Sequence, residues 1–363
     1  MPHIAGMSLE NFKGIESFRV GKLPITKPDK NGEGYMEMNK EEALKNVVLI
    51  RGNKEIASLK DFFAFLNDFM LTDLICALQR RGFTEPSVDK IQASIFVDMG
   101  NSEFLLYNLT IRESLSTRGL TVAETIFSYR SDEQPQTVAL KTGDTLFLSS
   151  DGIEWEGAGT MSEYQSIFVG TPSKGELPKS VTELGAYFLS YFPFDFDCTS
   201  WASSLSYGDP TPMLTRDGSN IARVAAYWRQ TERKSYDKIA GYVKNHYVFS
   251  KQVESNAWEL AFSAFASGNG FLSNSVTIIN VIKSDVTSFA MRLLLMHAEL
   301  YGNIFIHFPD KHQTQAETES YLRELKSIVD TELADKDVQI WIFTQNKYLF
   351  RDESHKISAI TLT

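Results

Sequence analysis

The sequence predicts an α/β protein, in which a mixed sheet with flanking helices is joined to an antiparallel β-meander and an inserted helical subdomain. Three observations lead to this expectation. An apolar strand near residue 47 precedes a helical pattern, four segments between residues 91 and 148 alternate apolar and polar residues, and strands alternate with helices from residue 276 onward. Because strand–helix–strand units join parallel strands, we expect a parallel sheet in the C-terminal part.

The N-terminal segments predict a hairpin, a loop, a strand and a helix. Residues 7–23 alternate around Gly14, which is typical of a short hairpin. Residues 24–45 are rich in proline, glycine and charge, and we expect a loop or a short insertion there. The apolar run 47–50 and the helical pattern 59–70 predict a buried strand, a tight loop and a buried helix.

The next segments predict a β-meander. Turn signals stand at Met99-Gly100-Asn101 and at Thr142-Gly143-Asp144. The predicted strands are 91–97, 104–111, 122–129 and 136–148.

From about residue 160 to residue 265 the pattern is mostly helical. Asp217-Gly218-Ser219-Asn220 opens a helix, with Ser219 or Asn220 as its cap. Further on, strand patterns alternate with helical patterns at 288–300 and 317–334. We predict that one sheet contains the strands 47–50, 276–281, 303–307 and 339–343.

The length and charge limit the classes of protein. The chain has 363 residues, 43% apolar content and a formal charge of −10. This length predicts an N-terminal lobe with the meander (1–160), a helical insertion or arm (161–265) and a C-terminal lobe that completes the sheet (266–363). The acidic balance argues against a globally basic nucleic-acid binder, although a local basic patch stays open.

Cysteine usage and hydropathy predict a cytoplasmic protein. Cys76 and Cys198 are far apart and lack a partner motif, so neither a disulfide framework nor a cysteine zinc site is expected. The N-terminus lacks the pattern of a signal peptide, and the apolar cluster at 293–296 is flanked by Arg292 and His297. We therefore expect neither secretion nor membrane insertion.

Five segments stand in a recognisable order. They are LENFKGIESF (9–18), VVLIRGNKEIASLKDFFAFL (47–66), a stretch with Asp-Gly-Ser-Asn (214–247), IKSDVTSFAMRLLLMHAEL (282–300), and a strand followed by Pro309 and Asp310 (303–329). In order and spacing they resemble the SMC/RecF-like branch of ABC-type ATPases, particularly the bacterial AAA-domain ATPases related to the OLD family. The resemblance implies an ABC-ATPase-like P-loop fold.

In that family a phosphate-binding loop, Gly-x-x-x-x-Gly-Lys-Ser/Thr, follows the first apolar strand. Gly52 fits the first glycine, and Asn53 and Lys54 lie within the loop. The same register places Ala57 at the second glycine, Ser58 at the lysine that reaches the β- and γ-phosphates, and Leu59 at the Mg²⁺ ligand. The alternative is an ordinary strand–turn–helix unit without a ligand.

The signature motif of the family is also altered. Ser284, Asp285 and Thr287 match it, but Val286 stands in place of the glycine. In a working dimer that glycine lets the backbone approach the γ-phosphate held by the opposite subunit, and a branched valine blocks positive φ and adds bulk. The resemblance therefore implies that this contact is lost.

The last two motifs lack their charged groups. His307 stands at the Mg²⁺-linked aspartate and Phe308 at the glutamate that would orient the attacking water, while Asp310 still matches. Gln345 replaces the histidine that senses the γ-phosphate. Together with the changes at Ser58 and Leu59, every group that offsets charge in phosphoryl transfer is replaced.

Other candidate sites are weaker. His307 and His312 flank Asp310, but this spacing matches no standard metal-ligand pattern. Asp195 and Asp197 suggest a paired acid and base, or else the solvated face of a strand. The aromatic tract 187–201 predicts either a core helix and turn or an exposed partner surface.

The resemblance implies a catalytically inactive ABC-ATPase-like protein that acts as a structural or regulatory subunit of a dimeric assembly, in phage defence or DNA maintenance. No cofactor is expected, and the partner would be a second copy or an ATPase- or nuclease-type subunit, with DNA contact left open. One alternative is an active, divergent ATPase that uses ATP and Mg²⁺, with Lys54 or Lys60 recruited to phosphate. Another is an unrelated α/β enzyme.

Overall fold

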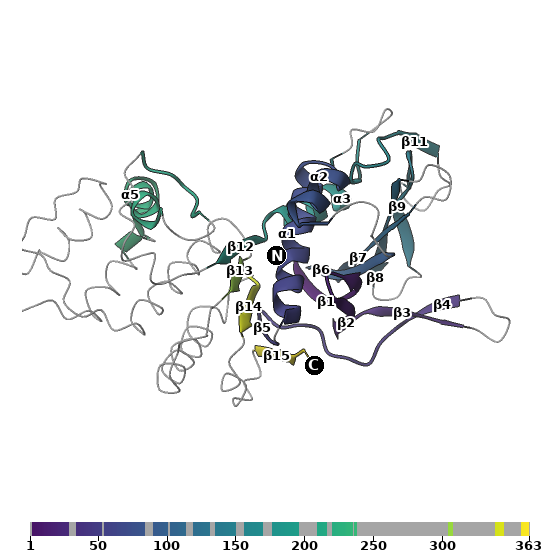
Figure 1. Ribbon diagram of the computed structural model, residues 1–363, viewed down its shortest axis with the longest axis horizontal. Helices are drawn as coiled ribbons and strands as arrows, with labels where there is room; N and C mark the ends of the chain where they lie inside the picture. The colour runs from purple at the N-terminus through teal and green to yellow at the C-terminus, as the bar shows by residue number, and fades with distance from the viewer. Residues whose placement is uncertain are drawn as a thin grey trace, which may run out of the picture. The chain divides into compact units, whose positions relative to one another are not determined.

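The chain forms two compact units, and Figure 1 labels their elements. The computed structural model describes residues 2–28, 34–52, 54–83, 90–100, 102–113, 119–130, 135–149, 156–169, 176–195, 209–215, 220–234, 236–237, 304–307, 338–344 and 357–362. The first unit extends to Tyr191 and also includes residues 338–339 and 357–362, whereas the second takes the other described residues. The boundary predicted at residue 265 lies outside the described residues, so the three-part division stays a prediction.

The first unit is built on an eight-stranded antiparallel sheet with the order β11-β10-β9-β8-β7-β6-β1-β2. Its strands are β1 (His3–Phe12), β2 (Ile15–Gly21), β6 (Ile91–Gly100), β7 (Glu103–Glu113), β8 (Leu120–Arg130), β9 (Gln136–Thr142), β10 (Thr145–Leu148) and β11 (Glu156–Thr160). The predicted hairpin and meander are therefore confirmed. The β1–β2 turn consists of Lys13 and Gly14, which both have positive φ (46° and 86°), as a two-residue type I′ turn requires.

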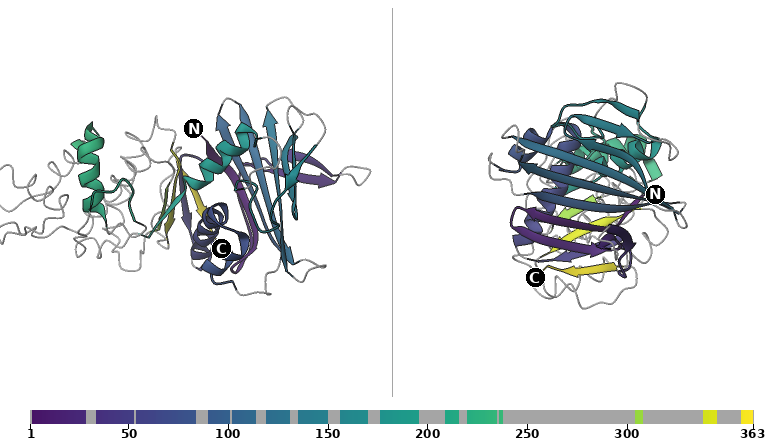
Figure 2. Two further views of the ribbon diagram at one scale, coloured as in Figure 1. Left: turned by 90° about the horizontal axis from the view of Figure 1, so that it is seen from above. Right: turned by 90° about the vertical axis from the view of Figure 1, so that its right-hand side faces the viewer.

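Three helices cover one face of this sheet, which we call the inner face (Figure 2). They are α1 (Lys54–Leu71), α2 (Leu74–Arg80) and α3 (Lys179–Leu189). Phe12 of β1 packs edge-on against Phe62 of α1, with ring centroids 5.3 Å apart, and both side chains are fully buried. The predicted helix 59–70 is confirmed, but it begins five residues earlier, at Lys54.

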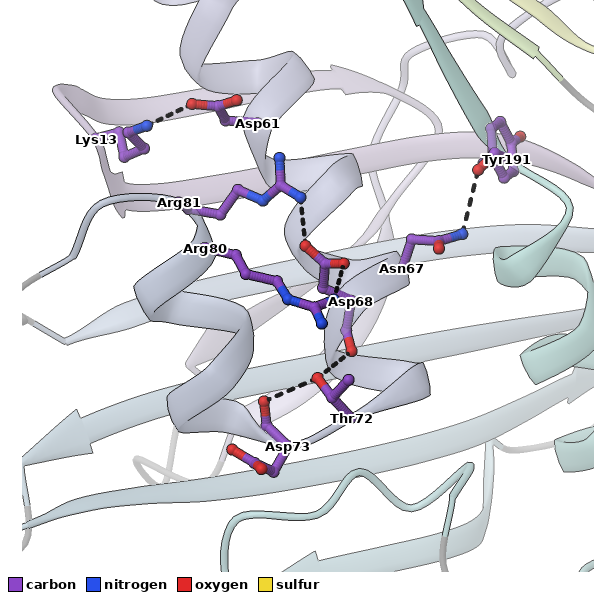
Figure 3. A network of polar contacts seen from close by, with 9 residues as sticks. All are labelled: Lys13, Asp61, Asn67, Asp68, Thr72, Asp73, Arg80, Arg81 and Tyr191. Carbon is purple, nitrogen blue, oxygen red and sulfur yellow. Dashed lines mark hydrogen bonds and ion pairs between the residues drawn. The ribbon is translucent and has the colours of Figure 1, made fainter. Parts of the chain in front are cut away.

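An ion-pair cluster fixes α2 against α1 (Figure 3). Asp68 of α1 accepts a hydrogen bond from Arg80 Nη1 at 2.9 Å and pairs with Arg81, just beyond the end of α2. Asp73 caps α2 by accepting from Cys76 N at 2.8 Å. These contacts explain why so short a helix has a fixed position.

Residues 24–45 form more than the loop that the sequence predicts. β3 (Pro24–Pro28) and β4 (Gly34–Met38) pair as a two-stranded antiparallel hairpin. The hairpin lies on the outer face of the eight-stranded sheet, opposite the helices (Figure 2). Proline occurs only at the first and last positions of β3, where a sheet tolerates it. The proline content of this segment, which favours a loop, is therefore compatible with a strand.

A five-stranded sheet has the order β12-β13-β14-β5-β15. Its strands are β12 (Phe192–Asp195), β13 (Ile304–His307), β14 (Ile340–Thr344), β5 (Val47–Arg51) and β15 (Ile357–Thr361). β12, β13 and β14 are parallel, as are β5 and β15. The prediction of one sheet is confirmed for 47–50, 303–307 and 339–343, while 276–281 lies outside the described residues. The sequence did not predict β12 or β15, and β12 corrects the expectation of a mostly helical segment after residue 160.

Candidate functional site

The strand–helix connection at Gly52 is where the sequence predicts a degenerate phosphate-binding loop. β5 ends at Arg51 and α1 begins at Lys54, so this connection is only two residues long. A Cβ added to Gly52 would lie 2.9 Å from the Cβ of Leu362, and Leu362 N donates to Arg51 O at 2.6 Å. The glycine therefore accommodates a neighbouring leucine side chain of the same unit.

The positions predicted to replace the lysine and the Mg²⁺ ligand lie inside α1. Ser58 Oγ donates to Lys13 O at 2.7 Å, and Leu59 is fully buried. Ala57 is exposed on the helix surface. Ser58 is the fifth residue of α1, so from Ser58 onward the backbone N–H groups bond to carbonyl groups within the helix. Neither ATP nor Mg²⁺ fits these residues in the way that the family binds it.

The charges around the start of α1 also disfavour an anion. Glu55 lies in the first turn, where a carboxylate already complements the positive end of the helix dipole. Lys13, in the turn between β1 and β2, forms an ion pair with Asp61 one turn beyond Ser58 (Figure 3). A nucleotide at this end would face a carboxylate, and the nearby Lys13 is already paired.

The structure brings His307 and Asp195 to neighbouring positions. Both end their strands, and the parallel register pairs Asp195 with His307 and His307 with Phe343. Sequence reasoning treated Asp195 and His307 as separate candidates, because β12 was not predicted. The carboxyl ends of parallel strands are the usual place for ligand sites in such sheets.

Several predicted site residues lie outside the described residues: Asn53, Asp197, Ser284, Asp285, Val286, Thr287, Phe308, Asp310, His312 and Gln345. Of the landmark Asp217–Asn220, only Asn220 is described. It precedes α5 (Ile221–Thr231), as predicted, but its side chain makes no capping bond. Instead, Asn220 Oδ1 accepts from Thr215 N at 2.7 Å, and Nδ2 donates to Met213 O at 2.9 Å. This asparagine therefore holds the backbone of residues 213–215 close to the start of α5.

The inner face contains a buried charged cluster that the sequence did not predict. Among the residues whose burial is described, Glu124 of β8 and Lys141 of β9 are the charged side chains that are fully buried. Glu124 Oε1 accepts from Tyr107 Oη and Ser166 Oγ, both at 2.7 Å, and Oε2 accepts from Ile167 N at 2.8 Å. Lys141 Nζ donates to Glu163 O at 3.1 Å.

This cluster holds residues 161–169, which we call the crossing segment, against the sheet. An irregular buried segment must pair its backbone groups. Glu124 supplies the acceptor for Ile167 N–H, and Lys141 supplies the donor for Glu163 C=O. Burial raises the pKa of Glu124, against the opposing effect of its three hydrogen bonds and of Lys141, and burial lowers the pKa of Lys141. The cluster is closed to solvent and is structural.

A second buried cluster shows whether the aromatic tract 187–201 lies in the core or on an exposed surface. Gln339 accepts from Ile4 N at 3.0 Å and from Tyr191 Oη at 2.9 Å, and its amide nitrogen donates to Ile4 O at 2.9 Å. Tyr187 and Phe188 are buried in α3, and burial raises the pKa of Tyr187. The core interpretation of the tract is therefore confirmed for residues 187, 188 and 191.

The described part of the chain contains no group of three histidine, cysteine or acidic residues that could hold a metal ion. Cys76, in α2, is a free thiol. Among the described helices, none is long and apolar enough to cross a membrane.

No family model and no curated protein matches the sequence. Among solved structures, the chain is similar to the recombination mediator protein RecF with ATP in the RecFOR pathway, at 11% identity and a TM-score of 0.32, over 95% of this chain and 94% of that chain. It is also similar to an Smc head bound to the C-winged helix domain of ScpA, at 8% identity and a TM-score of 0.37, over 96% and 91% of the two chains. These structures are of RecF and an Smc head, and the motif order of the sequence resembles the SMC/RecF-like branch. Since the TM-scores are low, the fold is defined by this chain's own strand order.

Proposed function

We propose that this chain is an ABC-ATPase-like protein that has lost ATP hydrolysis and acts as a structural or regulatory subunit, in DNA maintenance or phage defence. The fold part of the proposal is supported by the sheet order. The strand that precedes Gly52 and the strand that ends at His307 belong to one sheet, as the motif resemblance requires.

The single observation that carries the loss of activity is the two-residue connection between β5 and α1. A phosphate-binding loop needs enough backbone outside the helix for its N–H groups to surround a phosphate. Here the helix begins at Lys54, Ser58 bonds to the carbonyl of Lys13, and Leu59 is in the core. A loop of this length cannot enclose a phosphate in the family's manner.

The test is to measure ATP binding and phosphate release with the purified full chain and Mg²⁺. We expect no phosphate release above the protein-free blank. The decisive variants are Lys54→Ala and Lys60→Ala, with Lys90→Ala, whose lysine lies outside α1 and its connection to β5, as the matched control. Turnover that is abolished by either of the first two variants, but not by the control, would establish the divergent-ATPase alternative.

The partner part of the proposal is a second copy of the chain or an ATPase- or nuclease-type subunit. In the resembled family, nucleotide joins the two subunits, so a chain without a working nucleotide site would have to associate through buried surface. A stable interface of that kind buries upwards of about 1,000 Å² in total. We therefore expect sedimentation to show association that is independent of Mg-ATP, whereas dimerisation only after its addition would show a functioning site.

A further inference from the structure

The paired strands β3 (Pro24–Pro28) and β4 (Gly34–Met38) form a strap over the outer face of the antiparallel sheet. Its base is locked by Asn39, whose Oδ1 accepts from Leu23 N at 3.0 Å and whose Nδ2 donates to Gly21 O at 2.9 Å. Asn39 N also donates to Leu23 O at 2.9 Å. The two ends of the strap are therefore joined by hydrogen bonds at its root.

Beyond this root, two methionines attach the strap to the sheet. Met36 and Met38 pack against a buried apolar cluster of Ala5, Leu23, Phe96 and Leu106. Three aromatic residues pack against the same cluster, and we call the cluster together with them the outer patch: Phe104, Phe127 and Tyr129. Tyr129 Oη donates to Met36 Sδ at 2.6 Å, and burial raises the pKa of Tyr129 to about 12, so its hydroxyl stays a donor at neutral pH. The strap is held by thioether–aromatic packing and one weak hydrogen bond.

The two methionine residues are partly open to solvent. Met36 and Met38 are half-buried, whereas Met7 is fully buried and Met70 is 4% exposed. Within the first unit, the helices α1, α2 and α3 lie on the opposite face of the sheet (Figure 2). A small oxidant therefore has access to Met36 and Met38 while the protein is folded.

We propose that Met36 and Met38 form an oxidation site at which hydrogen peroxide releases the strap from the outer patch. A sulfur lone pair attacks one peroxide oxygen, the O–O bond breaks, and the departing hydroxide takes up the remaining proton. The products are one methionine sulfoxide and one water for each peroxide consumed, so sulfur is oxidised and peroxide reduced.

The consequence follows from polarity and from the size of the strap. A sulfoxide is polar and chiral, and it fits poorly on a surface of phenyl rings. An isolated two-stranded hairpin is marginal in water, so the strap depends on this packing for its order. Release would expose aromatic side chains of the outer patch, which is the kind of surface that binds partners.

The experiment treats the full chain with hydrogen peroxide and follows two readouts: oxidation of each methionine by peptide mass mapping, and hydrogen exchange of the amides in 34–38. We expect Met36 and Met38 to be oxidised well before Met7 and Met70, and exchange in the strap to rise at least about tenfold. Methionine sulfoxide reductases should reverse the rise, because sulfoxide formation is reversible.

Two variants distinguish the effect of oxidation at Met36 and Met38 from the effect of oxidation elsewhere in the chain. Met36→Leu with Met38→Leu keeps apolar volume and should leave strap exchange unchanged by peroxide. Met213→Leu removes an exposed methionine (43% exposed) of the second unit and should respond as the wild type does. Oxidised Met36 with unchanged exchange, unoxidised Met36 beside oxidised Met213, or an equal rise in the double variant would each overturn the proposal.

Discussion

The connection at Gly52 and the buried cluster around Glu124 differ in what the sequence predicts and what the structure shows. At Gly52 the sequence pointed to a site for a charged ligand, yet the structure shows a short turn, a leucine beside the glycine and a buried Leu59. At Glu124 the alternating pattern predicted an ordinary strand, yet the structure buries a carboxylate and an ammonium there. The comparison teaches that strong polar interactions in this chain hold a segment in place where no motif marks them.

The largest effect should come from removing the carboxylate of the buried cluster. Glu124→Ala leaves Ile167 N–H and two hydroxyls without their acceptor, and it removes the carboxyl group with the largest charge effect on Lys141. We expect the free energy of unfolding to fall by about 3–5 kcal/mol, measured by urea denaturation. Thr125→Ala, the next residue on β8 and on the opposite face, is the control and should change stability by less than about 1 kcal/mol. Equal effects of the two variants would show that the cluster does not hold the crossing segment.

At the other region, the expected effect is smaller and steric. Gly52→Ala places a Cβ 2.9 Å from Leu362 Cβ, and overpacking of this kind costs about 1–3 kcal/mol. The combination with Leu362→Ala should recover part of this loss, because it removes most of the leucine side chain. If Gly52→Ala were neutral alone, Leu362 would not be the reason for a glycine here.

The hydroxyl of Ser58 tests the same region more gently. Ser58→Ala removes the hydrogen bond to the carbonyl of Lys13, and we expect a loss of about 1 kcal/mol in the free energy of unfolding. Ala57→Ser, at the exposed neighbouring position, should have almost no effect. An unchanged stability in Ser58→Ala would mean that this hydroxyl is free to serve another role, and would reopen the nucleotide question.

Much of the fold could be predicted because its signals are local. The alternation in 91–148 and the apolar run at 47–50 each reflect burial that a single strand shows by itself. β3 and β4 were not predicted because proline, glycine and charged residues dominate 24–45. The residues that Met36 and Met38 pack against come mostly from strands distant in the sequence. β12 and β15 are short strands whose partners lie far along the chain.

The candidate sites were harder to predict for the same reason. Motif register placed Ser58 and Leu59 at the positions that bind phosphate and Mg²⁺, but α1 begins at Lys54, and both residues lie inside this helix. Glu124 stands at an inward-facing position of VAETIFSY, which was the one available sign of a buried charge. Its hydrogen-bond donors come from segments up to 43 residues away, so spacing could not reveal them.

The last expected effect is a pH dependence that isolates the ionisation of Glu124. Burial raises the pKa of this carboxyl in the folded protein above its usual 4.5. At a pH between 4.5 and the raised pKa, the folded protein therefore binds a proton that the unfolded chain has released. The contribution of Glu124 to the free energy of unfolding therefore falls as pH rises through this window, by about 1.4 kcal/mol for each unit of pKa difference. Glu124→Gln has no ionisable group at this position and lacks this fall.

The stability gap, which is the free energy of unfolding of the wild type minus that of Glu124→Gln, should accordingly be largest below pH 4.5 and should decrease as the pH rises above that value, measured by urea unfolding. Lys141 faces the same cluster, and burial lowers its pKa from 10.5, so its contribution to the free energy of unfolding rises with pH in the window below 10.5, opposite in sign to that of Glu124. Lys141→Met reports this contribution separately. A gap that widens with pH would mean that Tyr107, Ser166, Ile167 and Lys141 together hold the folded pKa of Glu124 below 4.5. In that case hydrogen bonding would outweigh burial, and the cluster would stabilise the crossing segment as an ionised carboxylate at neutral pH.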